Sequence, residues 1–210
     1  MSEFDGPAFV RFLGTFADRI HDARDELTRL DSAIGDADHG INMDRGFTAV
    51  RAKLADLDGS DPGAIAKAVG MTLISTVGGA SGPLYGTLFL RMATSFGEKA
   101  TVDAAGLGAA LRAGLEGVVH RGKAEPGEKT MVDALAPAVD AYDRAVDDGI
   151  GPALAAAAAA AAEGRDRATP LVARKGRASY LGERSAGHQD PGATSTTILL
   201  ESLRDAVAEG

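Results

Sequence analysis

Apolar residues recur along most of this chain with the three-to-four-residue spacing of amphipathic α-helices. The clearest case lies near the N-terminus, where one helical face carries Phe9, Phe12, Leu13, Phe16 and Ile20. Strand-like alternation is nearly absent. Seven further segments show the helical period, and they are centred on Phe47–Leu57, Ile65–Leu73, Leu84–Met92, Leu107–Val118, Met131–Val146, Ala155–Ala162 and Ile198–Val207. The pattern therefore predicts an all-α protein of eight helices, each of about 15–20 residues.

Glycine-rich or polar segments separate these helices. The 27 glycines are about twice the usual share and cluster between the periodic stretches. Four segments are of interest, at residues 31–40, 78–83, 121–130 and 169–192. The last exceeds the roughly 12–15 residues that a structureless loop in a compact domain usually reaches, which favours a binding loop or lid. With no linker or internal repeat, we expect a single domain over residues 1–210.

Composition excludes several classes of protein. The 22 Lys and Arg against 30 Asp and Glu give a net charge of −8, which argues against nucleic acid or an anionic membrane surface as the main partner. The absence of cysteine excludes disulfides, thiolate zinc sites and a cysteine nucleophile. No apolar stretch is long enough to span a membrane, and Met1–Asp5 does not open a secretory signal. A cytoplasmic location is the simplest expectation.

The segment from Asp31 to Gly40 places three carboxylates within eight residues: Asp31, Asp36 and Asp38. Carboxylates this close repel one another, and a divalent cation relieves the repulsion. All-oxygen ligation suits Mg²⁺ or Ca²⁺, and the spacing fits an EF-hand poorly, so Mg²⁺ shared with substrate phosphates is the better hypothesis. The competing interpretation is that these aspartates cap the next helix and are otherwise solvated. From the residues alone, the two are about equally supported.

Two further features suggest an anionic ligand. Gly78–Pro83 leads directly into a helix, where free backbone N–H groups accept phosphate oxygen, although Ser81 could equally be a helix cap. Arg174–Arg177 is a basic cluster in an acidic protein, for which solvated side chains are the default reading. His39 could hold a neighbouring loop, bind a nucleotide or act as an acid–base group, and ordinary structural use is the commonest of these.

Taken together, these segments closely resemble the nucleotide-binding (L) subunit of bacterial dihydroxyacetone kinases of the phosphotransferase-system type. The similarity follows family order over essentially the whole chain, and many relatives carry glycine at the position of Ala37, a small change. The matching blocks are IGDADHG-INM-RGF (Ile34–Phe47), MTLISTVGGASGPLYGT (Met71–Thr87), RGKAEPGEKTM (Arg121–Met131) and ARKGRASYLGERSAGHQDPGATS (Ala173–Ser195).

The resemblance implies an antiparallel eight-helix barrel that binds ADP or ATP at one end, with two Mg²⁺ ions between the aspartates and the phosphates. Asp31, Asp36 and Asp38 match the metal ligands, and Arg177 adds positive charge to this catalytic group. The remaining matched positions are nucleotide contacts, with Met131 against the base: His39, Gly40, Ile41, Asn42, Ala80, Ser81, Gly122, Met131, Arg177, Asp190, Pro191 and Gly192.

The resemblance also implies a division of labour. The ketone substrate would lie on a separate K subunit that supplies the acid–base groups, and a phosphohistidine carrier (M) subunit would rephosphorylate the bound ADP. The absence of a fused K-like domain favours this type over relatives that use free ATP. The alternatives are an ATP-dependent kinase for another short ketose or for a fatty acid, and a nucleotide-sensing module without catalysis.

Overall fold

The computed structural model describes residues 3–57 and 59–209. Nine α-helices lie within these residues, together with three short 3₁₀ segments and a two-residue strand pair. The predicted all-α class is therefore confirmed. The helices are α1 (Gly6–Asp22), α2 (Arg24–Ile34), α3 (His39–Arg51), α4 (Pro62–Thr76), α5 (Ser81–Phe96), α6 (Ala104–Gly122), α7 (Val132–Arg144), α8 (Ile150–Ala168) and α9 (Pro191–Ala208).

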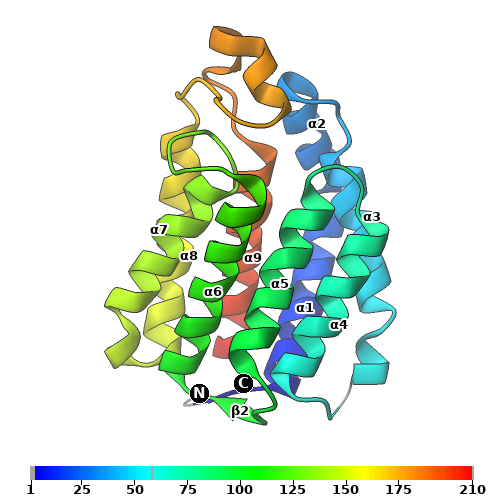
Figure 1. The fold of residues 1–210 in the computed structure, drawn as a ribbon, viewed down its shortest axis with the longest axis vertical. Helices are drawn as coiled ribbons and strands as arrows, with labels where there is room; N and C mark the ends of the chain where they lie inside the picture. The colour runs from blue at the N-terminus through cyan, green and yellow to red at the C-terminus, as the bar shows by residue number, and fades with distance from the viewer. Residues whose placement is uncertain (1–2, 58, 210) are drawn as a thin grey trace.

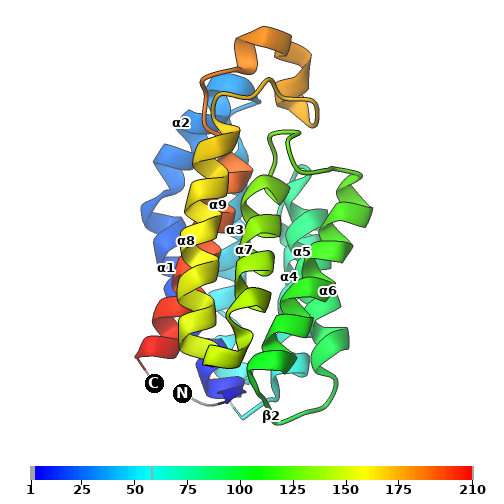
Figure 2. The same ribbon diagram turned by 90° about the vertical axis from the view of Figure 1, so that its left-hand side faces the viewer.

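Eight of these helices form a closed ring. Each of α1, α3, α4, α5, α6, α7, α8 and α9 packs against the next, and α9 packs back against α1. Successive members run in opposite directions (Figure 1). Helix α2 follows α1 after the single residue Ala23 and extends beyond the ring at one end (Figures 1 and 2). The predicted antiparallel eight-helix barrel is thus correct, with α2 as an addition to it.

The barrel interior is apolar, and its sequence signals are local. All seven phenylalanines are buried, and the face predicted from Phe9, Phe12 and Phe16 points inward on α1. The Asp61–Pro62 pair begins α4 as expected, because the Asp61 carboxylate accepts a hydrogen bond from the Ala64 N–H at 2.7 Å. None of the helices in the described chain combines the length and apolarity needed to cross a lipid bilayer.

Several boundaries differ from the prediction. Helix α3 begins at His39 and ends at Arg51, and the expected continuation to Leu57 is a separate 3₁₀ turn, η1 (Leu54–Leu57). Helix α2 was not predicted, because its buried stripe of Leu27, Asp31 and Ile34 carries a carboxylate where an apolar residue would complete the pattern. At 11 residues α2 is also shorter than the predicted helix length, as are α3 and α7 at 13 each.

The two ends of the barrel differ in character. At one end a small antiparallel sheet, β1 (Phe4–Asp5) with β2 (Thr101–Val102), joins the N-terminus to the approach of α6. At the other end lie the four connections that sequence analysis singled out, now bounded at residues 35–38, 77–80, 123–131 and 169–190. The last connection, which we call the lid (residues 169–190), contains the 3₁₀ segment η3 (Arg177–Ser185) and lies above the mouth of the barrel (Figures 1 and 2).

Candidate functional site

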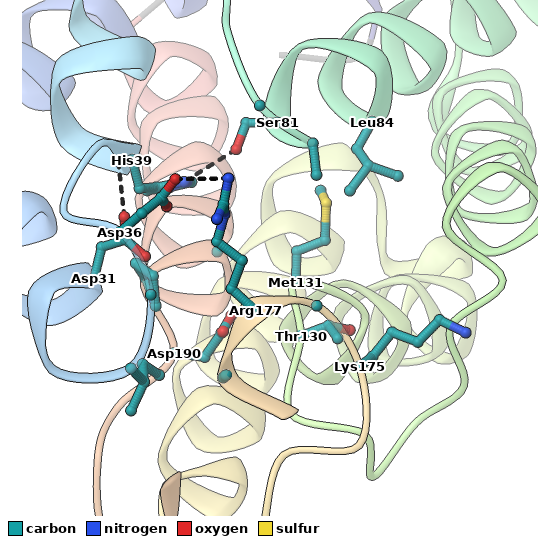
Figure 3. A pocket seen from close by; sticks show the side chains of 18 of the residues that line it. Asp31, Asp36, His39, Ser81, Leu84, Thr130, Met131, Lys175, Arg177 and Asp190 are labelled. Carbon is teal, nitrogen blue, oxygen red and sulfur yellow. Dashed lines mark hydrogen bonds and ion pairs between the residues drawn. The ribbon is translucent and has the colours of Figure 1, made fainter. Parts of the chain in front are cut away.

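A polar cavity of about 190 Å³ opens where the four connections meet. Antiparallel helices bring alternate connections to the same end of a bundle, so segments far apart in the chain converge there. Figure 3 shows side chains from the 35–38, 123–131 and 169–190 connections around the opening, together with Ser81 at the start of α5. The wall includes residues from α2, from the start of α3, from the glycine loop (residues 77–80), from the α6–α7 connection, from the lid and from the start of α9.

Three carboxylates converge on one side of this cavity. One oxygen from each of Asp31, Asp36 and Asp38 lies within 4.8 Å of the others. Asp31 occupies the last turn of α2, and its Oδ2 accepts hydrogen bonds from the backbone N–H groups of Asp38 (2.8 Å) and His39 (3.1 Å). These bonds fold the 35–38 turn back on α2. The predicted loop from Asp31 to Gly40 is therefore two helix ends joined by a short turn.

The local charge favours a cation. Burial and the neighbouring carboxylate of Asp36 raise the pKa of Asp38, as expected when negative charges are held together. The donor set is oxygen only, which fits Mg²⁺. Arg177 of the lid provides a positive group, with its Nη2 2.9 Å from Asp36 Oδ2 (Figure 3). Ala37 has φ +62°, a left-handed conformation that costs a non-glycine residue about 1–2 kcal/mol, so the carboxylates are held in a tight turn.

His39 connects the first residue of α5, where the glycine loop ends, to α9. Its ring nitrogens lie 3.0 Å from Ser81 Oγ and 3.0 Å from Ser195 Oγ, and Ser195 Oγ in turn lies 2.7 Å from the Tyr85 hydroxyl. Burial lowers the pKa of His39 to about 4, so the ring is neutral at physiological pH. Of the roles considered for His39, holding a neighbouring loop is the one that these contacts support.

A second, largely apolar cavity of about 320 Å³ adjoins the polar one. The two cavities share Ala80, Leu84, Thr130 and Met131, together with lid residues Lys175 and Gly176. Met131 and Leu84 point toward each other across this region (Figure 3). A flat apolar group could thus lie beside Met131 while a charged group attached to it reaches the carboxylates.

Most of the residues selected from the sequence line these cavities. The walls include Asp31, Asp36, Asp38, His39, Ala80, Ser81, Gly122, Met131, Arg177, Asp190, Pro191 and Gly192. The other three selected residues, Gly40, Ile41 and Asn42, lie on α3 outside both walls. Ile41 is exposed, and Asn42 Oδ1 accepts a hydrogen bond from Arg45. Gly40 is packed against α2. Their assignment as nucleotide contacts stays a prediction.

Some wall residues were missed from the sequence. Leu84 lies one helical turn after Ser81, and Thr130 directly precedes Met131, so both positions could have been found by extending the selected motifs. Lys129 gives no such signal, because a lysine in a polar loop is normally assumed to be solvated. In the structure it is 1% exposed.

Asp190 caps α9 at the base of the polar cavity. Its carboxylate accepts a hydrogen bond from the Ala193 N–H at 2.7 Å. Burial, reinforced by the charges of Asp133 and Asp31, raises the pKa of Asp190 to about 7 against the opposing effect of that N–H and of Lys129. The folded protein therefore binds a proton here between about pH 4 and pH 7 that the unfolded chain has already released.

Replacing Asp190 with asparagine should stabilise the protein at neutral and alkaline pH. Since the folded pKa is raised, the wild type loses stability as pH rises from about 4 to about 7, whereas asparagine caps the helix without titrating. Since each pKa unit corresponds to about 1.36 kcal/mol, the rise in pKa from 3.8 to about 7 puts the gain at about 4 kcal/mol at pH 8, falling to a small fraction of that near pH 4. Urea unfolding at pH 4 and pH 8 measures this gain. The titration of His39 contributes equally to the wild type and the variant, so it does not affect the difference between them. A gain that is equal at both pH values would contradict the shifted pKa.

Comparison with known proteins identifies the family. The DAK2 domain model matches residues 33–205. The chain is 46% identical over 202 residues to the Escherichia coli (strain K12) protein named PEP-dependent dihydroxyacetone kinase, ADP-binding subunit DhaL, covering 95% of this chain and 96% of that protein. The chain belongs to the DAK2 domain family. The resemblance inferred from the sequence motifs is thereby confirmed.

One further relative and one solved structure extend the comparison. The Lactococcus lactis protein named PTS-dependent dihydroxyacetone kinase, ADP-binding subunit DhaL, is 43% identical and covers 95% of this chain and 96% of its own length. The crystal structure of the dihydroxyacetone kinase from C. freundii in complex with AMP-PNP and Mg²⁺ superposes with a TM-score of 0.72 at 24% identity. The superposition covers 95% of this chain and 33% of the C. freundii chain. At 24% identity this likeness shows a shared fold.

Proposed function

We propose that this DAK2 chain is the ADP- and ATP-binding subunit of a dihydroxyacetone kinase, acting in the cytoplasm as one domain over residues 1–210. The observation that carries the proposal is the junction of three converging carboxylates with an apolar cavity at the mouth of the barrel. Such a site suits a nucleotide, because a base needs apolar walls whereas magnesium-bound phosphates need oxygen ligands. The full-length relatives named as ADP-binding subunits support the same function.

The residues around the cavity would have different roles, according to their positions. Asp31, Asp36 and Asp38 would hold two Mg²⁺ ions, which when bound neutralise and orient the phosphate oxygens. Ser81 and the N-terminus of α5 would support the phosphates, while Met131 packs against the base. Arg177 reaches the cavity from the lid and would supply further positive charge. His39 would keep the glycine loop in place rather than move a proton, since it is neutral and both its nitrogens are engaged.

The chemistry would be a two-step phosphoryl relay. In the first step a phosphohistidine on a separate carrier (M) subunit would give its phosphoryl group to the β-phosphate of ADP, breaking a P–N bond and forming ATP. In the second step ATP would pass its γ-phosphoryl group to the terminal hydroxyl of dihydroxyacetone on a K subunit, regenerating ADP. Phosphoryl transfer depends mainly on positioning and charge stabilisation, so no covalent nucleophile is required of this chain.

Reconstitution tests this proposal. We expect native mass spectrometry of the purified protein to show retained ADP, and incubation with the phosphorylated carrier to convert it to ATP in place. Addition of the K subunit and dihydroxyacetone should then give dihydroxyacetone phosphate over many turnovers. Multiple turnovers on free ATP without the carrier would instead indicate a direct ATP-dependent kinase. Binding of ADP with no sugar phosphate formed would indicate a nucleotide sensor.

A further inference from the structure

The buried lysine of the α6–α7 connection is fully engaged in hydrogen bonds. Lys129 is 1% exposed, and its Nζ donates to the backbone carbonyl oxygens of Thr169 (2.7 Å), Leu171 (3.0 Å) and Ser185 (2.7 Å). An ammonium group has three N–H donors, so all three are satisfied. The residue borders the polar cavity, but its charged end is directed to these carbonyls.

The three carbonyls belong to the two ends of the lid. Thr169 and Leu171 lie where the chain leaves α8, whereas Ser185 lies where it returns toward α9. Two further hydrogen bonds close the same base, from the Gly187 N–H to the Thr169 carbonyl (2.9 Å) and from the Ala173 N–H to Ser185 Oγ (2.8 Å). Lys129 therefore joins the first and last segments of the lid to each other and links both to the α6–α7 connection.

The Arg174 N–H of the lid also donates to the Glu128 carbonyl oxygen of the α6–α7 connection, at 3.1 Å. Another attachment of the lid lies at α2 and the turn that follows it. There Ala178 packs against Ile34 of α2, and Arg177 pairs with Asp36. The Arg177 side chain is 66% exposed, and ion pairs at such exposed positions contribute little. Charge-assisted hydrogen bonds in a buried site are considerably stronger. Of the two charged side chains, Arg177 and Lys129, the lysine is thus the stronger anchor.

We propose that Lys129 is a positioning residue that holds the lid over the mouth of the barrel and thereby slows exit of the bound nucleotide. It acts through the lid, whose residues Lys175 and Gly176 line both cavities and whose Arg177 reaches the carboxylates. The consequence for nucleotide exit rests on the proposed function, whereas the anchoring of the lid does not.

Two lysines of the same connection provide a matched test. Lys123 and Lys129 both have positive φ, at 49° and 63°, but Lys123 is exposed and lines neither cavity. Replacing Lys129 with methionine keeps the length of the side chain and removes the ammonium, and Lys123→Met is the control. Hydrogen–deuterium exchange of residues 172–187 reports the lid in the nucleotide-free protein. Stopped-flow release of a fluorescent ADP analogue with Mg²⁺ reports nucleotide exit.

We expect Lys129→Met to speed exchange in the lid and release of the analogue by about tenfold or more, since three hydrogen bonds to a charged group are lost. Exchange in α1 and α9 and the Mg²⁺ requirement of binding should stay as in the wild type. Lys129→Arg, which keeps charge and donors, should fall between the two, and Lys123→Met should match the wild type.

Unchanged lid exchange in Lys129→Met would overturn the proposal. So would exchange that accelerates equally in α1 and α9, because the lysine would then support the whole fold. If wild-type protein fails to bind the analogue, the proposed function is wrong and the claim about nucleotide exit falls with it. The exchange data would still decide whether Lys129 anchors the lid.

Discussion

Replacing Asp36 with asparagine should lower the affinity for ADP at saturating Mg²⁺ by about a hundredfold or more. Substitutions of groups that merely support a metal ligand cost about 10–100-fold, and the loss of a ligand should reach at least the upper end of that range. Asparagine keeps the size of the side chain but loses the charge that offsets a divalent cation. Isothermal titration of ADP in the presence of Mg²⁺ measures the effect directly.

Asp36 is the most informative of the three carboxylates to change. Asp31 also accepts hydrogen bonds from the backbone N–H groups of Asp38 and His39. Its replacement would therefore disrupt the turn as well as remove a proposed metal ligand. The side chain of Asp36 is paired with Arg177 and lies at the exposed edge of the group. A loss of binding in Asp36→Asn can therefore be assigned to the site rather than to the fold.

The cation dependence separates the metal role from simple charge. In excess chelator, Asp36→Asn should bind ADP no more weakly than wild type, because one negative charge near the phosphates has been removed. Asp148→Asn makes the same change of charge on an exposed residue at the opposite end of the barrel and should behave as wild type. Equal ADP affinity for Asp36→Asn and wild type at saturating Mg²⁺ would exclude Asp36 as a ligand.

Much of this site could be predicted because its signals are local. The glycine and acidic segments stand out between periodic helices, and antiparallel packing then brings all four to one end of the barrel. The proposed metal-binding role of the aspartates was harder to infer. From the residues alone the aspartates were as consistent with helix capping as with a metal, and the contacts show that Asp31 has a turn-closing role in addition to facing the cavity.

What could not be predicted depends on contacts between distant segments. Helix α2 has too few apolar residues to stand out, and its buried stripe is completed by Asp31, which the turn and the cavity require. The burial of Lys129 depends on carbonyl groups 40 to 56 residues away, about which a lysine in a polar loop gives no information. The strand pair of Phe4–Asp5 with Thr101–Val102 is likewise a long-range pairing, between segments too short to show alternation.

Replacing Gly40 with alanine should destabilise the protein by about 1–3 kcal/mol, the usual range for overpacking. A Cβ at Gly40 would overlap the carbonyl oxygen of Arg24 and lie 2.5 Å from Thr28 Oγ1 and 2.8 Å from the Thr28 backbone nitrogen. Backbone atoms cannot give way as a flexible side chain can, so α3 must move away from α2. Urea unfolding measures the change in free energy.

This displacement should also weaken the metal site. Asp31 lies on α2, whereas Asp38 directly precedes α3. Separating the two helices therefore stretches the hydrogen bonds that Asp31 Oδ2 accepts from the Asp38 and His39 N–H groups. We therefore expect Gly40→Ala to lower ADP affinity at saturating Mg²⁺ even though Gly40 does not line either cavity. A nucleotide contact made by Gly40 itself would predict weaker binding without a loss of stability.

The two explanations are separated by a glycine that is free of contacts. Gly14 lies within α1, and a Cβ added there meets nothing within 4 Å. Gly14→Ala should stabilise the protein by about 0.5–1 kcal/mol, because alanine loses less backbone entropy on entering a helix. Gly40 lies in the first turn of α3, so alanine gains no more helix propensity there than at Gly14. A net loss of stability in Gly40→Ala therefore reflects the clash with α2. If Gly40→Ala were as stable as Gly14→Ala, the close approach of α2 and α3 would not be what requires glycine at this position.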